Sequence, residues 1–414
     1  MGDDVGRGGA RAAGVTRAAD GLVLAAGRIV AGPGVLSPGY LVVSEGRVAE
    51  VGQGPPPRRP DVELADGLLV PGFVDLQVNG YFGEEFATAG PAGWERVVSR
   101  LPETGVTAFM PTIITSPADR LAAALRSAAT LIPGLPAGAR VLGIHMEGPF
   151  ISPLRKGAHN AEWITDPAPA AVEELLAAGS GQLRLVTLAP ERDGAIAAIG
   201  RLTRAGVLVS VGHSDATSAQ VAAAVDAGAR MVTHLFNGQR PMHHREPGVP
   251  GHALADSRVT SGLIADMWHV AAEVCVIAFA AAPGRICLVT DAAACAGMPP
   301  GQYLLGGEPI TLPEGGAPPV RADGTLAGSA LRMDTAVANM VAAGAALPDA
   351  VAAASRIPAD LIGRPDLGRI APGAAADLTW LDDDLRTQAA WVGGDMVYSA
   401  IGSGARPAAE GAQR

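Results

Sequence analysis

The chain has 414 residues, of which 48% are hydrophobic and 17% charged, a composition typical of a folded globular protein and not of a disordered one. The net charge of −10 argues against general binding to nucleic acids or membrane surfaces, which needs basic patches, although a single arginine can still bind a phosphorylated small molecule. The three cysteines, Cys275, Cys287 and Cys295, have no metal-binding spacing, which favours buried thiols in a reducing compartment.

The N-terminal sequence is acidic and then rich in Gly, Ala and Arg, without the apolar segment of a secretory signal. The longest apolar stretch, residues 274–282, is too short to span a bilayer. The sequence therefore predicts a cytoplasmic protein that binds neither nucleic acid nor membrane.

Residues 1–19 are expected to form a flexible tail. Between residues 21 and 50, short apolar runs alternate with glycine-containing turn signals, which predicts β-strands joined by hairpins. A loop rich in Pro and Arg follows at residues 52–60.

Eight apolar runs come next, and Ala- and Leu-rich segments with helical periodicity lie between many of them. The near-continuous apolar character of the runs is typical of parallel strands that are buried on both faces. Eight such units in succession predict an α/β fold with a (β/α)₈ TIM-type barrel over residues 70–371. The runs are residues 68–80, 105–114, 141–150, 183–191, 206–214, 230–238, 259–266 and 286–294.

After the eighth run, the Gly- and Pro-rich residues 299–325 predict a long loop with a hairpin, and residues 331–344 and 347–363 predict two helices. The strand-like segment that follows is expected to return to the N-terminal strands. Residues 20–69 and 372–402 would then form one small β-sandwich-like domain from both chain ends, and residues 403–414 a second flexible tail.

Ionisable residues lie at the C-terminal ends of the predicted strands, where barrel enzymes place their active sites. Glu147, His213 and His234 form a set of two histidines and a carboxylate that suits zinc with one position open to water. Any one of these histidines alone is more simply a hydrogen-bonded core residue, but the combination favours a metal site. Asp291 either faces the metal-activated water as a general acid/base or caps a helix.

Several motifs together resemble the N-acetylglucosamine-6-phosphate deacetylase family of the amidohydrolase superfamily over residues 20–400. Each motif is modest alone, but their joint order is specific. They are PGFVDLQVNG, GIHMEGPFI, KGAHN, VGHSDA, THLFNG, REPG, IADMWHV, LVTDA and DGTLAGSAL.

The resemblance implies that Glu147, His213 and His234 are the metal ligands and that Asp291 is the catalytic acid/base. It also implies that His159 binds and polarises the acetyl carbonyl. The remaining implied substrate-binding positions are Asn237 and Gly238, Arg245 at the phosphate, His269 reaching the phosphate from a partner subunit, and Leu326, Ala327 and Gly328 over the sugar.

Where amidohydrolases usually carry His-x-His, which helps to bind a second metal, this chain has Gln77 and Asn79. Neutral amides are poor zinc ligands. The sequence therefore predicts a single divalent metal, zinc or alternatively iron.

The resemblance implies a homodimeric enzyme in which a metal-activated water, with Asp291 as general acid/base, converts N-acetylglucosamine 6-phosphate to glucosamine 6-phosphate and acetate. Three alternatives stay open. These are the N-acetylgalactosamine 6-phosphate epimer as substrate, another amidohydrolase reaction, and a non-catalytic barrel that only binds.

Overall fold

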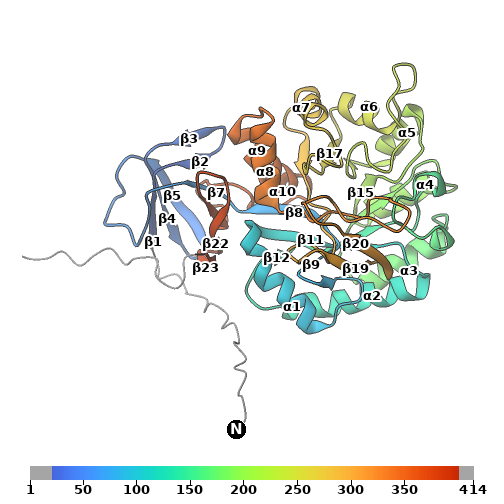
Figure 1. Ribbon diagram of the computed structural model, residues 1–414, viewed down its shortest axis with the longest axis horizontal. Coiled ribbons are helices and arrows are strands. Elements are labelled where there is room, and N and C mark those ends of the chain that lie inside the picture. The colour runs from blue at the N-terminus through green and yellow to red at the C-terminus, as the bar shows by residue number, and fades with distance from the viewer. Residues whose placement is uncertain (1–20, 401–414) are drawn as a thin grey trace, which may run out of the picture.

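The structure, a computed structural model, describes residues 21–400. The predicted tails 1–19 and 403–414 lie outside the described residues. Figure 1 shows a barrel flanked by helices and, beside it, a smaller β domain in which blue N-terminal strands lie next to red C-terminal strands. Both parts of the predicted fold class are confirmed.

Eight parallel strands form the barrel, and each pairs with the next along the chain. They are β8 (Phe73–Val78), β11 (Val106–Ile114), β13 (Ile144–Glu147), β14 (Leu183–Leu188), β15 (Leu208–Val211), β16 (Met231–Val232), β17 (Thr260–Leu263) and β18 (Ile286–Leu288). The short β12 (Arg140–Val141) adds a further parallel pairing to β11.

The helices of the barrel layer follow the strands in chain order. They are α1 (Pro91–Arg100), α2 (Ala118–Leu131), α3 (Pro169–Gly179), α4 (Ala195–Arg204), α5 (Ser218–Ala227), α6 (Gly248–Ala255), α7 (Ala272–Ala281), α8 (Met333–Ala342), α9 (Leu347–Ala354) and α10 (Arg356–Leu361). Short 3₁₀ segments are Leu101–Thr104, Ile132–Gly134, Pro153–Arg155 and Ala161–Trp163.

Local sequence explains these helices. In α2, Leu121, Leu125 and Ala128 recur at helical spacing and are all buried, so one face packs on the barrel. Helix α5 begins with a capping box, in which the Thr217 side chain accepts from the Gln220 backbone N–H while the Gln220 side chain accepts from the Thr217 backbone N–H.

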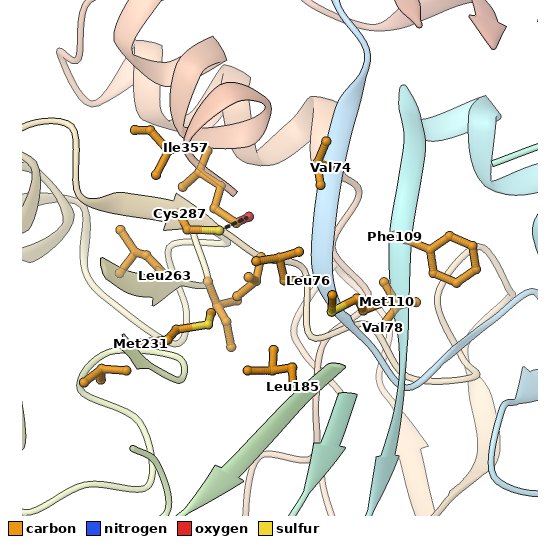
Figure 2. Packing of buried hydrophobic residues seen from close by; sticks show 14 of the residues in the cluster. Val74, Leu76, Val78, Phe109, Met110, Leu185, Met231, Leu263, Cys287 and Ile357 are labelled. Atoms are coloured by element: carbon orange, nitrogen blue, oxygen red, sulfur yellow. Dashed lines mark hydrogen bonds between the residues drawn. The ribbon is translucent and has the colours of Figure 1, made fainter. Parts of the chain in front are cut away.

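The barrel strands contribute to one large apolar core. Figure 2 shows Leu76, Leu185, Met231, Leu263 and Cys287, which come from five different barrel strands, gathered in one cluster. Each is at most 1% exposed. Burying one such side chain contributes about 1.5–3 kcal/mol, so the core fixes where the strand ends meet.

The small domain contains two sheets built from both ends of the described chain. One has the order β5-β4-β1-β6 and the other β23-β22-β21-β7-β2-β3. The strands are β1 (Leu22–Ala26), β2 (Ile29–Ala31), β3 (Gly34–Leu36), β4 (Gly39–Ser44), β5 (Arg47–Gln53), β6 (Val62–Leu64), β7 (Leu68–Pro71), β21 (Leu378–Leu381), β22 (Thr387–Val392) and β23 (Asp395–Ser399). The predicted return of the C-terminal segment is confirmed, because β21 pairs antiparallel with β7.

The prediction of one strand over residues 68–80 is wrong, because β7 belongs to the small domain and β8 to the barrel. Gly72 separates them at a point of close approach: a Cβ there would lie 2.1 Å from Thr107 Oγ1. The chain thus passes from one sheet to the other between Pro71 and Phe73. The exact domain borders stay a prediction.

The single helix predicted over residues 347–363 is also wrong, because the helix is interrupted at Ser355, which has φ −136° and ψ −79°. Pro358 lacks an N–H, and in a continuous helix its ring would clash with the carbonyl of Ala354. The hairpin expected within residues 299–325 is present as β19 (Gly301–Leu305) and β20 (Glu308–Leu312). A second small hairpin, β9 (Gly80–Tyr81) with β10 (Glu84–Glu85), follows β8.

The barrel closes where the end of β18 meets β8. Backbone hydrogen bonds join Asp291 N to Gln77 O at 2.9 Å and Asn79 N to Ala292 O at 2.8 Å. The buried Asp75 carboxylate reinforces this seam, since it accepts from Thr290 Oγ1 at 2.6 Å and from the Thr290 and Gln77 backbone N–H groups at 3.2 Å.

Burial raises the pKa of Asp75 to about 7, although its hydrogen bonds oppose that rise. Because the folded-state pKa lies above the unfolded value, the stability from this group is full below about pH 4 and is lost as the pH rises through about 7. A shift of this size corresponds to roughly 4 kcal/mol.

We therefore expect the unfolding free energy of the wild type, minus that of Asp75→Asn, to fall by up to about 4 kcal/mol between pH 4 and pH 8. Taking the difference cancels the other carboxyl groups that both proteins share. Urea unfolding of both proteins at a series of pH values, with the same metal concentration in every sample, measures this difference in unfolding free energy. A difference that stays constant with pH would contradict the assignment.

Candidate active site

A cavity of about 240 Å³ opens at the C-terminal ends of the barrel strands. Its lining comes from residues far apart in the sequence, which only the closed barrel brings together. The lining residues are Asn79, Ile114, Glu147, Gly157, Ala158, His159, His213, His234, Asn237, Gly238, Ile264, His269, Asp291, Leu305, Thr325, Leu326 and Gly328.

Glu147, His213 and His234 converge in this cavity. Glu147 Oε1 lies 3.1 Å from His213 Nε2 and 2.9 Å from His234 Nε2, and the two nitrogens are 3.1 Å apart. All three residues are buried and offer ligand atoms within 4.8 Å of one another. They are the one such metal-binding group found in residues 21–400. The structure therefore brings together the predicted ligand set.

Backbone carbonyls orient both imidazole rings. His213 Nδ1 lies 2.8 Å from Arg155 O, and His234 Nδ1 lies 3.0 Å from Asn237 O. A carbonyl can only accept, so each Nδ1 carries the proton and each Nε2 is directed at Glu147. Carbonyl partners of this kind are what fixes metal-binding histidines in the correct tautomer.

The close contacts among the three residues favour a positive charge between them. Burial alone would raise the pKa of Glu147, but the hydrogen bonds from His213 and His234 hold it well below its usual range. Burial would lower the pKa of His234, but the hydrogen bond to Glu147 raises it to about 9. A proton or a cation can supply that charge, and two nitrogens with one carboxylate oxygen fit a divalent metal.

Asp291 lies in the same cavity and is 8% exposed. Burial, together with the negative charge of Glu147, raises its pKa to about 6. Its Oδ1 accepts from Gln77 Nε2 at 3.0 Å and from Asn79 Nδ2 at 2.7 Å. The helix-cap alternative does not apply, because no helix begins here: the next helix in the chain is α8 at Met333.

His159 lies against the metal-binding set, with its ring centroid 4.4 Å from that of His213. Its Nδ1 shares a 2.7 Å hydrogen bond with Thr115 Oγ1. Burial lowers the pKa of His159 to about 3, so the ring is neutral at physiological pH.

Most of the predicted substrate-binding residues line the cavity, namely Asn237, Gly238, His269, Leu326 and Gly328. Two do not. Ala327 is fully buried and does not reach the cavity surface, and Arg245 lies on an exposed loop outside the lining.

The expectation that His269 reaches a partner's site stays a prediction, but the residue also has a place in its own chain. His269 lines the cavity of its own chain, where Asp266 Oδ2 contacts its Nδ1 at 2.6 Å. The Asp266 carboxylate also accepts from the backbone N–H groups of Trp268 and His269. These hydrogen bonds hold the His269 ring in an orientation that faces the cavity of the same chain.

The sequence did not point to Leu305 of the β19–β20 hairpin, which forms part of the cavity wall. Glu308 of the same hairpin accepts from Asn160 Nδ2 at 3.1 Å and from Arg321 Nη2 at 3.1 Å. The hairpin is thereby tied to the segment that carries His159. The Gly- and Pro-rich composition indicated a loop with a hairpin there, but it did not indicate that this hairpin lies against the cavity.

A (β/α)₈ barrel with a buried His₂-carboxylate set and a neighbouring carboxylate defines a metal-dependent hydrolase. The chain belongs to the amidohydrolase family, whose model matches residues 68–400. The family resemblance inferred from the motifs is confirmed by relatives of known activity and by solved structures.

The chain is 38% identical over 379 residues to N-acetylgalactosamine-6-phosphate deacetylase of Escherichia coli O157:H7, covering 91% of this chain and 99% of that one. It is 37% identical over 386 residues to human N-acetylglucosamine-6-phosphate deacetylase, covering 90% and 91%. A solved structure of the Mycobacterium smegmatis N-acetyl-D-glucosamine-6-phosphate deacetylase, in complex with N-acetyl-D-glucosamine-6-phosphate, matches with a TM-score of 0.87 and 38% identity, covering 92% and 100%.

Within residues 21–400, none of the helices combines the length and the apolar character that crossing a bilayer requires.

Gly238 offers a test of how the backbone supports the ligand set. Its φ is +58°, and a Cβ there would lie 2.9 Å from His213 Nδ1. Gly238→Ala should therefore displace the His213 ring from Arg155 O and weaken metal binding by about 10–100-fold, the usual effect of losing such support.

Gly206→Ala is the matched control, because Gly206 has a φ of +77° but a Cβ added there would have no atom within 4 Å. Metal affinity measured by competition with a chelator separates the two variants. Equal affinity in Gly238→Ala and Gly206→Ala would rule out the proposed contact with His213.

Proposed function

We propose that this amidohydrolase removes the acetyl group from N-acetylglucosamine 6-phosphate, giving glucosamine 6-phosphate and acetate. The observation that carries the proposal is one cavity in which a buried His₂-carboxylate set lies beside a second buried carboxylate, Asp291. The activities of the relatives supply the substrate class.

Glu147, His213 and His234 would hold one divalent cation, for which zinc is our choice and iron the alternative. When bound there, such a cation supplies a Lewis acid that polarises the amide carbonyl and lowers the pKa of water. A neutral Gln77 and Asn79 support the assignment of a single metal, since amides are weak ligands.

Asp291 has the position and charge of a general acid/base. With a pKa of about 6, it is mostly ionised at neutral pH and still basic enough to take a proton from the attacking water. The same carboxyl group then donates that proton to the sugar nitrogen as the C–N bond breaks, so the amine leaves neutral.

His159 would bind the acetyl oxygen. If its Nδ1 accepts from the Thr115 hydroxyl, its Nε2 carries the proton and can donate to the oxygen as negative charge develops. A neutral ring suits this role, because it has one N–H to give and does not repel the cation.

The phosphate group of the substrate would contact His269, which lines the cavity. It would also contact Arg245, which would have to reach in from outside the cavity. Arg245 does not line the cavity of its own chain, so we propose that it is supplied by a second copy in a homodimer. Exposed apolar side chains near these two residues in the sequence support a covering partner: Trp268, next to His269, is 61% exposed, and Met242, on the Arg245 loop, is 56% exposed. We place the enzyme in the cytoplasm.

The 4-epimer, N-acetylgalactosamine 6-phosphate, is the second candidate substrate. It is favoured by the 38% identity to a deacetylase that acts on it. No side chain that lines the cavity distinguishes the two epimers by its chemistry alone, so both substrates belong in the same assay.

We expect acetate release from N-acetylglucosamine 6-phosphate by protein containing one zinc per chain, and loss of release after treatment with a chelator. Release from the unphosphorylated sugar should be much weaker, because the phosphate contacts contribute binding energy. Faster release from the galactosamine epimer would replace the proposed substrate with that epimer. No release from any of the three would reject the proposed reaction while leaving the hydrolase family intact.

Mixing two differently impaired variants, assayed at a substrate concentration well below the raised KM, tests the partner assignment. Arg245→Ala should raise KM for the phosphorylated substrate by about 10–100-fold, the usual effect of losing a charged hydrogen bond. Asp291→Asn should keep the metal and lose turnover. Subunit exchange between them should restore activity, because a heterodimer contains one site with both Asp291 and a partner's Arg245. No restoration, despite heterodimer formation, would place Arg245 in the site of its own chain.

A further inference from the structure

Two buried amide side chains converge on a single oxygen of Asp291. Gln77 Nε2 lies 3.0 Å and Asn79 Nδ2 lies 2.7 Å from Asp291 Oδ1. Gln77 is fully buried and Asn79 is 3% exposed. Alternate residues of an extended segment point the same way, so both amides reach the site from one face of β8 and the residue after it.

The orientation of these amides follows from the charge that they face. An amide turned the other way would direct its oxygen at the Asp291 carboxylate, and like charges repel. The cost of the observed orientation is visible, because Gln77 Oε1 and Asn79 Oδ1 are both buried without a hydrogen-bond partner. A buried acceptor without a partner is unfavourable, so the contacts to Asp291 must offset that penalty.

The backbone of Asp291 is fixed independently of these amides. Its N–H donates to Gln77 O at 2.9 Å, its carbonyl accepts from Ser329 N at 2.8 Å, and its φ is +52°. These contacts place the Cα but leave rotation of the carboxylate open. Among the described residues, the hydrogen bonds to the carboxylate come from Gln77 and Asn79 and reach Oδ1 alone.

We propose that Gln77 and Asn79 are positioning residues that hold Asp291 through Oδ1 and so present Oδ2 to the water and to the leaving nitrogen. The proposal rests on the acid/base role given to Asp291 above. Gln77 Nε2 also lies 3.2 Å from Glu147 Oε1, so the same amide fixes the acid/base carboxylate relative to the ligand set. A proton that must be taken and returned at one oxygen requires a carboxylate that does not turn between the two steps.

The test uses near-isosteric replacements that remove the donors, Gln77→Met and Asn79→Leu, and the double variant. Each single variant should keep one metal per chain and an unchanged KM while kcat falls about 10²-fold, within the range that general acid–base catalysis contributes. Because both amides hold one oxygen, the double variant should lose less than the product of the two single losses.

Gln239→Met is the matched control for loss of a buried amide near the site. The Gln239 amide donates to Thr233 O and accepts from Phe236 N, with no contact to Asp291. Its replacement should lower the free energy of unfolding without the selective fall in kcat. If Gln77→Met and Asn79→Leu instead lose metal or raise KM as kcat falls, or keep kcat within twofold, positioning of Asp291 is refuted.

Crystal structures of the wild type and of the double variant decide the question even if the proposed substrate is wrong. The proposal expects one carboxylate orientation at Asp291 in the wild type and a rotated or split one in the double variant. An unchanged orientation refutes the proposal. A wild type that holds Asp291 as expected but releases no acetate from any assayed sugar rejects the proposed reaction and not the positioning role.

Discussion

The first and last strands of the barrel meet through backbone hydrogen bonds between the segments around Gln77 and Asp291, which are 214 positions apart in the sequence. Asp75 holds the same seam with three further contacts. The distance between Asp291 and the ligand set depends on this closure, because the ligand set lies on or just after strands in the middle of the chain and Asp291 follows the last strand. A shift of the seam by one residue would turn Gln77 and its neighbours away from the cavity.

Burial gives the site its chemistry as well as its shape. In the low-dielectric interior, Glu147 keeps its charge only because His213 and His234 are within hydrogen-bonding distance. Burial and the charge of Glu147 raise the pKa of Asp291 to about 6, because the groups that oppose this rise are weaker. Two carboxylates in one cavity therefore differ in proton affinity, and this difference supports the proposed roles, cation binding for Glu147 and proton transfer for Asp291.

Sequence periodicity predicted the barrel because parallel strands buried on both faces leave a strong apolar signal, and residues at their C-terminal ends must share one mouth. It failed between Pro71 and Phe73, where an uninterrupted apolar run changes sheets, and at Ser355, where helical composition hides a break. The positions of Arg245 and His269 depended on loop conformation, which periodicity does not encode. The bonds from Gln77 and Asn79 to Asp291 had no sequence signal, since an absent histidine does not reveal what its replacement contacts.

The small domain has a consequence for how the chain is made. Its six-stranded sheet is complete only after β21 has paired with β7, β22 with β21 and β23 with β22, and these are the last three strands of the described chain. While the ribosome produces the barrel, the edge of β7 that will receive β21 has no partner. An open strand edge is a template for pairing with other chains. Until β21 is synthesised, this open edge is therefore a place where the nascent chain can pair with another chain instead of with itself.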